Sequence, residues 1–174
     1  MVRRPGDDGH MAREVEVVGR DIRVKEVSAQ PVLGIRATTP MSQIGELIGR
    51  AFGEMFGYLG EVEVMPAGPP VAIYHTSESM EEDMDVEICV PVAGTVVARG
   101  RMNFGEIPAG TVACTLHVGP YSEIGAVYRD LVEWIEQHGH ETAGPPREVY
   151  IVGPGMTSDE SEYRTEVAWP IRPR

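Results

Sequence analysis

Carboxylates and tyrosines alternate with apolar residues in four extended segments of this sequence. Side chains two positions apart on a β-strand share a face. One face is apolar and is expected to pack on helices; it comprises Val71 and Ile73, Val86 and Ile88, Val149 and Ile151, and Val167 and Trp169. The opposite face then carries five residues able to recognise a ligand, which are Tyr74, Glu87, Glu148, Tyr150 and Glu166.

Tyrosine rings interleaved with carboxylates suit a hydrophobic organic cation, because the rings stack on its surface and a carboxylate compensates its charge. We therefore predict that the five residues line one ligand groove. Plainer interpretations stay open for most of them. Tyr74 and Tyr150 can simply fill the sheet, whereas Glu87 and Glu166 can each complete the hydrogen bonds of a hairpin.

Glu148 is the strongest single candidate. Its equivalent in an internal repeat described below is Ala72, so the two copies agree around this position and differ at it. A carboxylate on an apolar wall has a raised pKa because of desolvation, and a cationic ligand would restore its ionised form. A salt bridge to a surface arginine is the structural alternative. If the protein is an enzyme, Glu148 would be the general base and Tyr150 the general acid.

An internal duplication organises the chain. Residues 32–45 resemble residues 112–125 at an offset of 80 positions, and residues 67–74 resemble 143–150 at an offset of 76. Glu87 and Pro91 recur 79 positions later as Glu166 and Pro170. Repeats of this length indicate one duplicated domain instead of a solenoid. Two halves related by a pseudo-two-fold axis leave a seam between them, and seams commonly bind ligands.

Each copy predicts a βαββ unit, with repeats at about 21–93 and 101–172 inside one domain at 21–174. Residues at a helical spacing of three and four predict one buried helix face after residue 44, which includes Met55, and another after residue 124, which includes Tyr128 and Leu131. The predicted fold is α+β: an antiparallel sheet with the helices on one face and a central ligand groove. The strands that carry Glu148 and Glu166 are predicted to be antiparallel neighbours in this sheet. The first helix also carries glycines at every fourth position, which indicate close helix packing or, alternatively, room for a ligand at the seam: Gly45, Gly49, Gly53 and Gly57.

Composition excludes several function classes. The net charge of -12 and the dispersed basic residues argue against direct nucleic-acid binding. Cys89 and Cys114 lack metal-ligand spacing, so we expect free thiols, no metal and a cytoplasmic location. No apolar run is long enough to span a membrane. Residues 1–20 are expected to be a disordered tail. No phosphate loop or cofactor motif is present, so no cofactor is predicted.

Several motifs together resemble the GyrI-like small-molecule-binding domain over about residues 20–172. They are the segment His117 to Tyr121, the helix ending at Trp134-Ile135, the segment Gly144 to Tyr150 and the segment Thr165 to Val167. The resemblance implies a duplicated βαββ fold, a central pocket for hydrophobic and often cationic compounds, and a buried glutamate at Glu148. The same module is the effector-binding part of many bacterial transcription activators. Those regulators carry a helix-turn-helix domain ahead of it, which twenty tail residues cannot supply.

Two functions remain from different classes. The favoured one is a stand-alone module that sequesters or senses hydrophobic, cationic, drug-like compounds; any protein partner is unknown. The alternative is a hydrolase of electrophilic, cyclopropane-bearing genotoxic natural products, an activity that some GyrI-like proteins have. A haem carrier on the related SOUL-like fold is less favoured, since His117 has no partner motif that would make it an axial ligand. Binding is favoured because every feature found is needed for a pocket and none only for catalysis.

Overall fold

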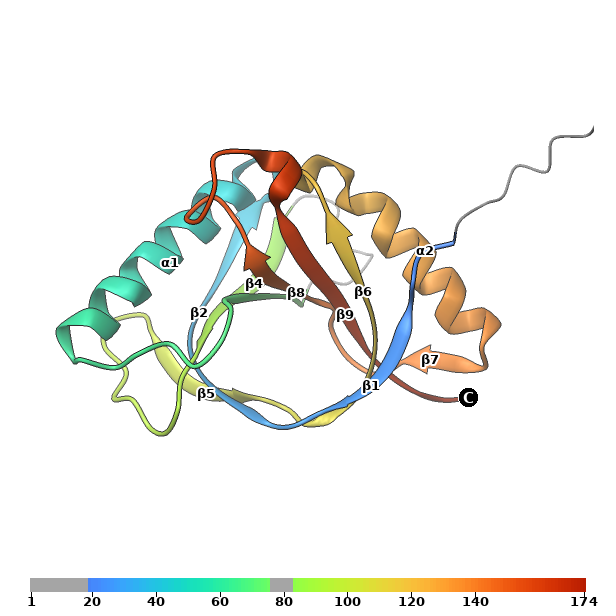
Figure 1. Ribbon diagram of the computed structural model, residues 1–174. Coiled ribbons are helices and arrows are strands. Elements are labelled where there is room, and N and C mark those ends of the chain that lie inside the picture. The colour runs from blue at the N-terminus through green and yellow to red at the C-terminus, as the bar shows by residue number, and fades with distance from the viewer. Residues whose placement is uncertain (1–18, 76–82) are drawn as a thin grey trace, which may run out of the picture.

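The computed structural model describes residues 19–75 and 83–174 (Figure 1). The predicted tail therefore lies almost entirely outside the described residues. The first half comprises β1 (Arg23–Val27), β2 (Gln30–Pro40), the 3-10 turn Met41–Gln43, α1 (Ile44–Glu61), β3 (Val71–Tyr74) and β4 (Asp83–Pro91).

The second half repeats this order and adds one short strand, β7. A 3-10 turn again precedes the helix, and a further 3-10 turn precedes the last strand. The elements are β5 (Asn103–Ile107), β6 (Gly110–Val118), the turn Tyr121–Glu123, α2 (Ile124–Gln137), β7 (His140–Thr142), β8 (Arg147–Val152), the turn Glu160–Glu162 and β9 (Arg164–Pro173).

The strands form one antiparallel sheet in the order β1-β6-β9-β8-β3-β4-β2-β5, with β7 pairing to β9. The α+β class and the duplicated βαββ halves are therefore confirmed. The predicted antiparallel neighbours that carry Glu148 and Glu166, β8 and β9, are also confirmed. The two halves meet where β3 pairs with β8, and there Ala72 lies directly opposite Glu148.

The two halves exchange their first strands. β1 of the first half pairs with β6 of the second, and β5 of the second half pairs with β2 of the first. Only two residues separate β1 from β2, and two separate β5 from β6. The sheet consequently curls until its ends meet, and Figure 1 shows it as a barrel-like ring.

Both helices cover the outside of this curled sheet, one per half (Figure 1). α1 packs on β2 and β4, whereas α2 packs on β6, β7 and β9. The core under α1 includes Leu33, Met55 and Ile88, and the core under α2 includes Leu131 and Val167. Helices on one face of the sheet were predicted and are confirmed. The central strands β3 and β8 lie between the two helices.

The inside of the curl is a second apolar environment, and it corrects the predicted strand faces. Val71, Ile73 and Val149 pack there with Cys89, not against the helices. The opposite face of β3 and β8, which carries Tyr74, Glu148 and Tyr150, points to the helix side. The assignment for β4 and β9 is correct, since Val86, Ile88 and Val167 lie under the helices. A curled sheet can bury valine and isoleucine on either face, so apolar alternation alone does not identify the helix side.

The glycines of α1 do not serve close packing. A Cβ atom built on Gly45, Gly49, Gly53 or Gly57 would meet nothing within 4 Å, apart from the helix's own nearby backbone. The prediction of close helix packing at these positions is therefore wrong. The buried face of α1 is formed by larger residues, namely Leu47, Ala51, Met55, Tyr58 and Leu59.

In the described part of the chain, no helix combines the length and the hydropathy needed to cross a membrane. Cys89 and Cys114 are buried free thiols, as predicted.

Candidate functional site

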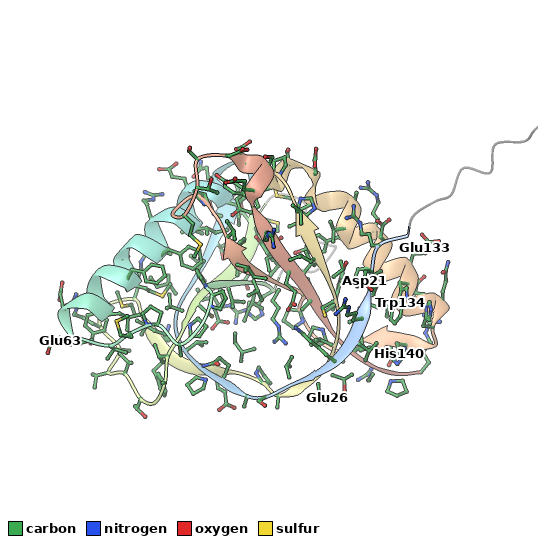
Figure 2. All side chains as sticks on the ribbon, in the orientation of Figure 1. Asp21, Glu26, Glu63, Glu133, Trp134 and His140 are labelled. Carbon is green, nitrogen blue, oxygen red and sulfur yellow. The ribbon has the colours of Figure 1, made fainter. Side chains whose placement is uncertain are left out.

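Glu148 lies at the centre of the seam between the helices. It is on β8, directly opposite Ala72 of β3. Ala72 has no side chain beyond Cβ, so its place leaves room for the longer carboxylate. Figure 2 shows the side chains that crowd into the space between the helices and the sheet.

Three tyrosine hydroxyls donate hydrogen bonds to the Glu148 carboxylate. Tyr128 of α2 reaches Oε1 at 2.8 Å, whereas Tyr150 reaches Oε2 at 2.8 Å and Tyr74 reaches the same oxygen at 3.3 Å. The hydroxyls of Tyr74 and Tyr150 lie 3.4 Å apart. These four residues, called the Glu148 site below, join α2 to both central strands.

Burial dominates the electrostatics of the Glu148 site. Only 6% of Glu148 is exposed, and this desolvation raises the pKa of its carboxyl, although the three hydroxyls act to lower it. Burial, together with the nearby carboxylate, also raises the pKa values of Tyr74, Tyr128 and Tyr150. The phenols therefore remain neutral donors. No lysine or arginine within the described ranges forms an ion pair with Glu148.

Further aromatic rings surround the Glu148 site. Phe52 of α1 contacts Tyr150 edge to face at 6.0 Å between ring centroids, and Tyr121 does so at 5.7 Å. Tyr121 also packs on Tyr163, and burial raises the pKa of Tyr121 to about 12. On the α2 side, the ring of Tyr128 contacts Trp169 edge to face. The site thus has an acidic centre and aromatic walls.

A shallow hollow of about 350 Å³ adjoins the site on the side of α2. Tyr128 connects the two, since its ring lines the hollow while its hydroxyl binds Glu148. Trp169 contributes a second aromatic surface and donates its Nε1 hydrogen to the carbonyl oxygen of Gly144. This Trp169 hollow is lined by Tyr128, Arg129, Val132, Glu133, Glu136 and Trp169.

Except for Tyr74, the polar residues of the Glu148 site belong to the second half. Tyr128 and Glu148 occupy the places that Ile48 and Ala72 take in the first half. The same holds for two buried neighbours on the helix side, because His117 and Thr165 correspond to Ala37 and Val86. His117 Nε2 lies 3.0 Å from the carbonyl oxygen of Pro120, whereas Thr165 Oγ1 has no hydrogen-bond partner among the described residues.

The structure brings together only three of the five predicted site residues. Tyr74, Glu148 and Tyr150 share the seam, whereas Glu87 and Glu166 lie on the opposite face, inside the curl. There His75 Nε2 lies 2.9 Å from Glu87, and Lys25 Nζ lies 2.9 Å from both carboxylate oxygens of Glu166. The prediction of one shared groove for all five is wrong, because apolar alternation does not show which face of a curled strand lies toward the helices.

Sequence reasoning missed Tyr128, which we interpreted as part of the apolar helix face. Its hydroxyl was the available signal, because a buried tyrosine usually needs a hydrogen-bond partner. Phe52, Tyr121 and Trp169 carried no comparable signal in the sequence. Among the residues that the structure describes, no group of three histidine, cysteine, aspartate or glutamate side chains could hold a metal ion.

Comparison with known proteins agrees with this architecture. Residues 20–172 match the model of the GyrI-like small molecule binding domain. No curated protein matches the chain.

Solved structures extend the comparison. The chain is 29% identical to EcmrR in its DNA complex, with a TM-score of 0.80. The match covers 88% of the present chain but only 57% of the EcmrR chain. The EcmrR C-terminal domain alone is 27% identical, with a TM-score of 0.73. This match covers 89% of the present chain and 99% of that domain. SAV2435, solved bound to tetraphenylphosphonium, has the same fold at 13% identity, with a TM-score of 0.63 and coverage of 87% and 94%.

Proposed function

Since the chain belongs to the GyrI-like small molecule binding domain family, we propose that it binds hydrophobic organic cations at the seam between α1 and α2. Glu148 supplies the negative charge, and the surrounding aromatic rings supply the binding surface. The observation that carries this proposal is a buried carboxylate held by three neutral phenols, with no protein cation paired to it in the described ranges.

Desolvation makes Glu148 selective for charge. A buried carboxylate gains more from a cation than an exposed one does, because the surrounding dielectric is low. The tyrosine hydroxyls orient it and hold it in place without neutralising it. A neutral ligand of similar shape would gain only the aromatic contacts, so charge should separate the two ligand types.

The Trp169 hollow offers the accompanying surface. An organic cation over Trp169 and Tyr128 would gain cation-π attraction, and the hydroxyl of Tyr128 leads from there to Glu148. Glu133 and Glu136 at the rim add negative potential, opposed by Arg129. Tetraphenylphosphonium is a suitable probe, since SAV2435 binds it on the same fold.

A titration tests the proposal. Wild type and Glu148→Gln are titrated with tetraphenylphosphonium and with neutral triphenylphosphine oxide. The substitution should weaken binding of the cation by about 2 to 4 kcal/mol, the range for removing one partner of a buried charge pair. Binding of the neutral compound should change much less. Glu54→Gln is the matched control, because Glu54 is exposed on α1 and binds Arg101. Equal losses for both ligands would contradict the charge role of Glu148.

The alternative proposal is hydrolysis, with Glu148 as general base beside Tyr150. A raised pKa brings a carboxyl closer to the range useful for proton transfer. The same variant separates the two proposals. Binding predicts lost affinity, whereas catalysis predicts intact affinity for a cyclopropane-bearing alkylator and turnover reduced about a hundredfold or more. Mass spectrometry of the small molecule after incubation measures that turnover.

A further inference from the structure

The inside of the curled sheet contains a second cavity, on the face that points away from both helices. Its volume is about 480 Å³, and residues of both halves line it. Its walls include the buried side chains of Ile73, Ile107 and Val112, and its polar lining includes His75, Glu87 and Glu106. We call it the barrel cavity. Its volume lies within the range of small-molecule sites, about 300 to 1,000 Å³.

The barrel cavity is separate from the Glu148 site. Successive side chains of a strand point to opposite faces, so Tyr74 contacts Glu148 while Ile73 and His75 line the cavity. The residues that line the cavity include none from the Glu148 site or the Trp169 hollow. A ligand in one space therefore contacts different side chains from a ligand in the other.

The two halves differ in the cation that their equivalent glutamates receive from the neighbouring first strand. Glu87 and Glu166 occupy equivalent places in the two halves, and Glu166 receives the ammonium group of Lys25. The equivalent of Lys25 is Gly105, so the first half has no lysine for Glu87.

Two other groups lie near Glu87, and neither is an ammonium group. His75 Nε2 lies 2.9 Å from Glu87 Oε2. Arg36 lies directly opposite Glu87 on β2 and donates its two hydrogen bonds to Asp85. A Cβ atom on Gly105 would meet nothing within 4 Å, so the space beside it is open. One end of the barrel thus has a lysine ammonium for its glutamate, and the other end lacks one.

We propose that the barrel cavity binds a small organic ammonium ion. Its charge lies beside Glu87 and Glu106, taking the role that Lys25 has toward Glu166. Its hydrocarbon body packs on Ile73, Ile107 and Val112. This inference does not depend on the function proposed for the Glu148 site.

The test is an NMR titration of the protein with cyclohexylammonium, with cyclohexanol and cyclohexanecarboxylate as neutral and anionic analogues. Cyclohexylammonium should shift the backbone amides of Ile73, Ile107 and Val112, and the analogues should bind more weakly. Glu87→Gln and Gly105→Lys should each lower the affinity for cyclohexylammonium by about fivefold, as expected for a partly exposed ion pair. Gly105→Lys should act by placing an ammonium group beside Glu87, as Lys25 does beside Glu166, so that it competes with the ligand.

Two controls make the result specific. Gly105→Ala adds a side chain without charge, and Glu54→Gln removes an exposed carboxylate of α1 that lies in neither proposed site; both should bind cyclohexylammonium as wild type does. Equal binding of cyclohexylammonium and its two analogues would overturn the proposal, and so would chemical-shift changes confined to Tyr128 and Trp169. Wild-type affinity in a folded Gly105→Lys variant would also overturn it. Tetraphenylphosphonium binding tests the Glu148 site separately, so either proposal can fail alone.

Discussion

Removing the hydroxyl of Tyr128 should destabilise the protein more than removing that of Tyr74. Tyr128 donates a hydrogen bond to Oε1 of Glu148, whereas Oε2 accepts hydrogen bonds from both Tyr150 and Tyr74. Tyr128→Phe therefore leaves one buried carboxylate oxygen without a partner. Tyr74→Phe removes only the longer of two bonds to the other oxygen.

Hydrogen bonds to charged groups contribute about 1.5 to 3 kcal/mol each. We expect Tyr128→Phe to lower the free energy of unfolding by that amount and Tyr74→Phe to lower it by less than about 1 kcal/mol. In the background of Glu148→Ala the loss from Tyr128→Phe should largely disappear, because the hydroxyl then has no carboxylate to bind. The double variant resembles the pair Ile48 and Ala72 of the first half, so the fold should accommodate it.

Urea unfolding of the wild type, of Tyr128→Phe, of Glu148→Ala and of the variant with both substitutions gives the coupling energy between Tyr128 and Glu148 directly. It should be about 1.5 to 3 kcal/mol, and it should shrink at acidic pH as Glu148 becomes protonated and loses its charge. A coupling below about 0.5 kcal/mol, within the usual error of additivity, would refute the reasoning. So would equal losses for Tyr128→Phe and Tyr74→Phe.

Three further predictions concern stability. Because the pKa of Glu148 is raised in the folded state, its contribution to the free energy of unfolding should fall as the pH rises from the ordinary glutamate pKa of 4.5 through the folded pKa. Urea unfolding across this pH window should show no such fall for Glu148→Gln. Thr165→Val should stabilise the protein by about 1 kcal/mol, because it removes a buried hydroxyl without a partner and Val86 fills the equivalent place; a lower thermal midpoint would contradict this. Gly53→Ala should add about 0.5 to 1 kcal/mol in the same assay, because the helix gains propensity and the added Cβ meets no neighbour; a loss would mean that the glycine is needed for contacts.

The duplication and the helix periodicity were sufficient to predict the fold class. Spacing alone placed Leu131 and Met55 in the core, and both are buried. The faces of β3 and β8 were not predictable in the same way, because Val71 and Val149 are buried inside the curl and resemble residues buried under a helix. The curl depends on pairing between β1 and β6 and between β2 and β5, segments that are distant along the chain.

The site was predictable where the two copies differ. Comparing Glu148 with Ala72 identified the central carboxylate, although its strand was assigned to the wrong face. The same comparison at Tyr128 and Ile48, or at Thr165 and Val86, would have indicated the other polar groups of the seam. Phe52 and Trp169 could not be found this way, because an aromatic residue among apolar positions looks like ordinary core until its neighbours are known.

The exchange of first strands suggests how a solitary charge could arise on a symmetry axis. A protein made of one repeat would complete its sheet by lending its first strand to a second copy, which makes a swapped homodimer. In such an ancestor any glutamate at the place of Glu148 would face an identical glutamate where Ala72 now pairs with it. Two carboxylates that close repel, and one of them is forced to keep its proton. When both copies lie in one chain, each half can change alone, and one acid can lie opposite an alanine, as Glu148 does opposite Ala72.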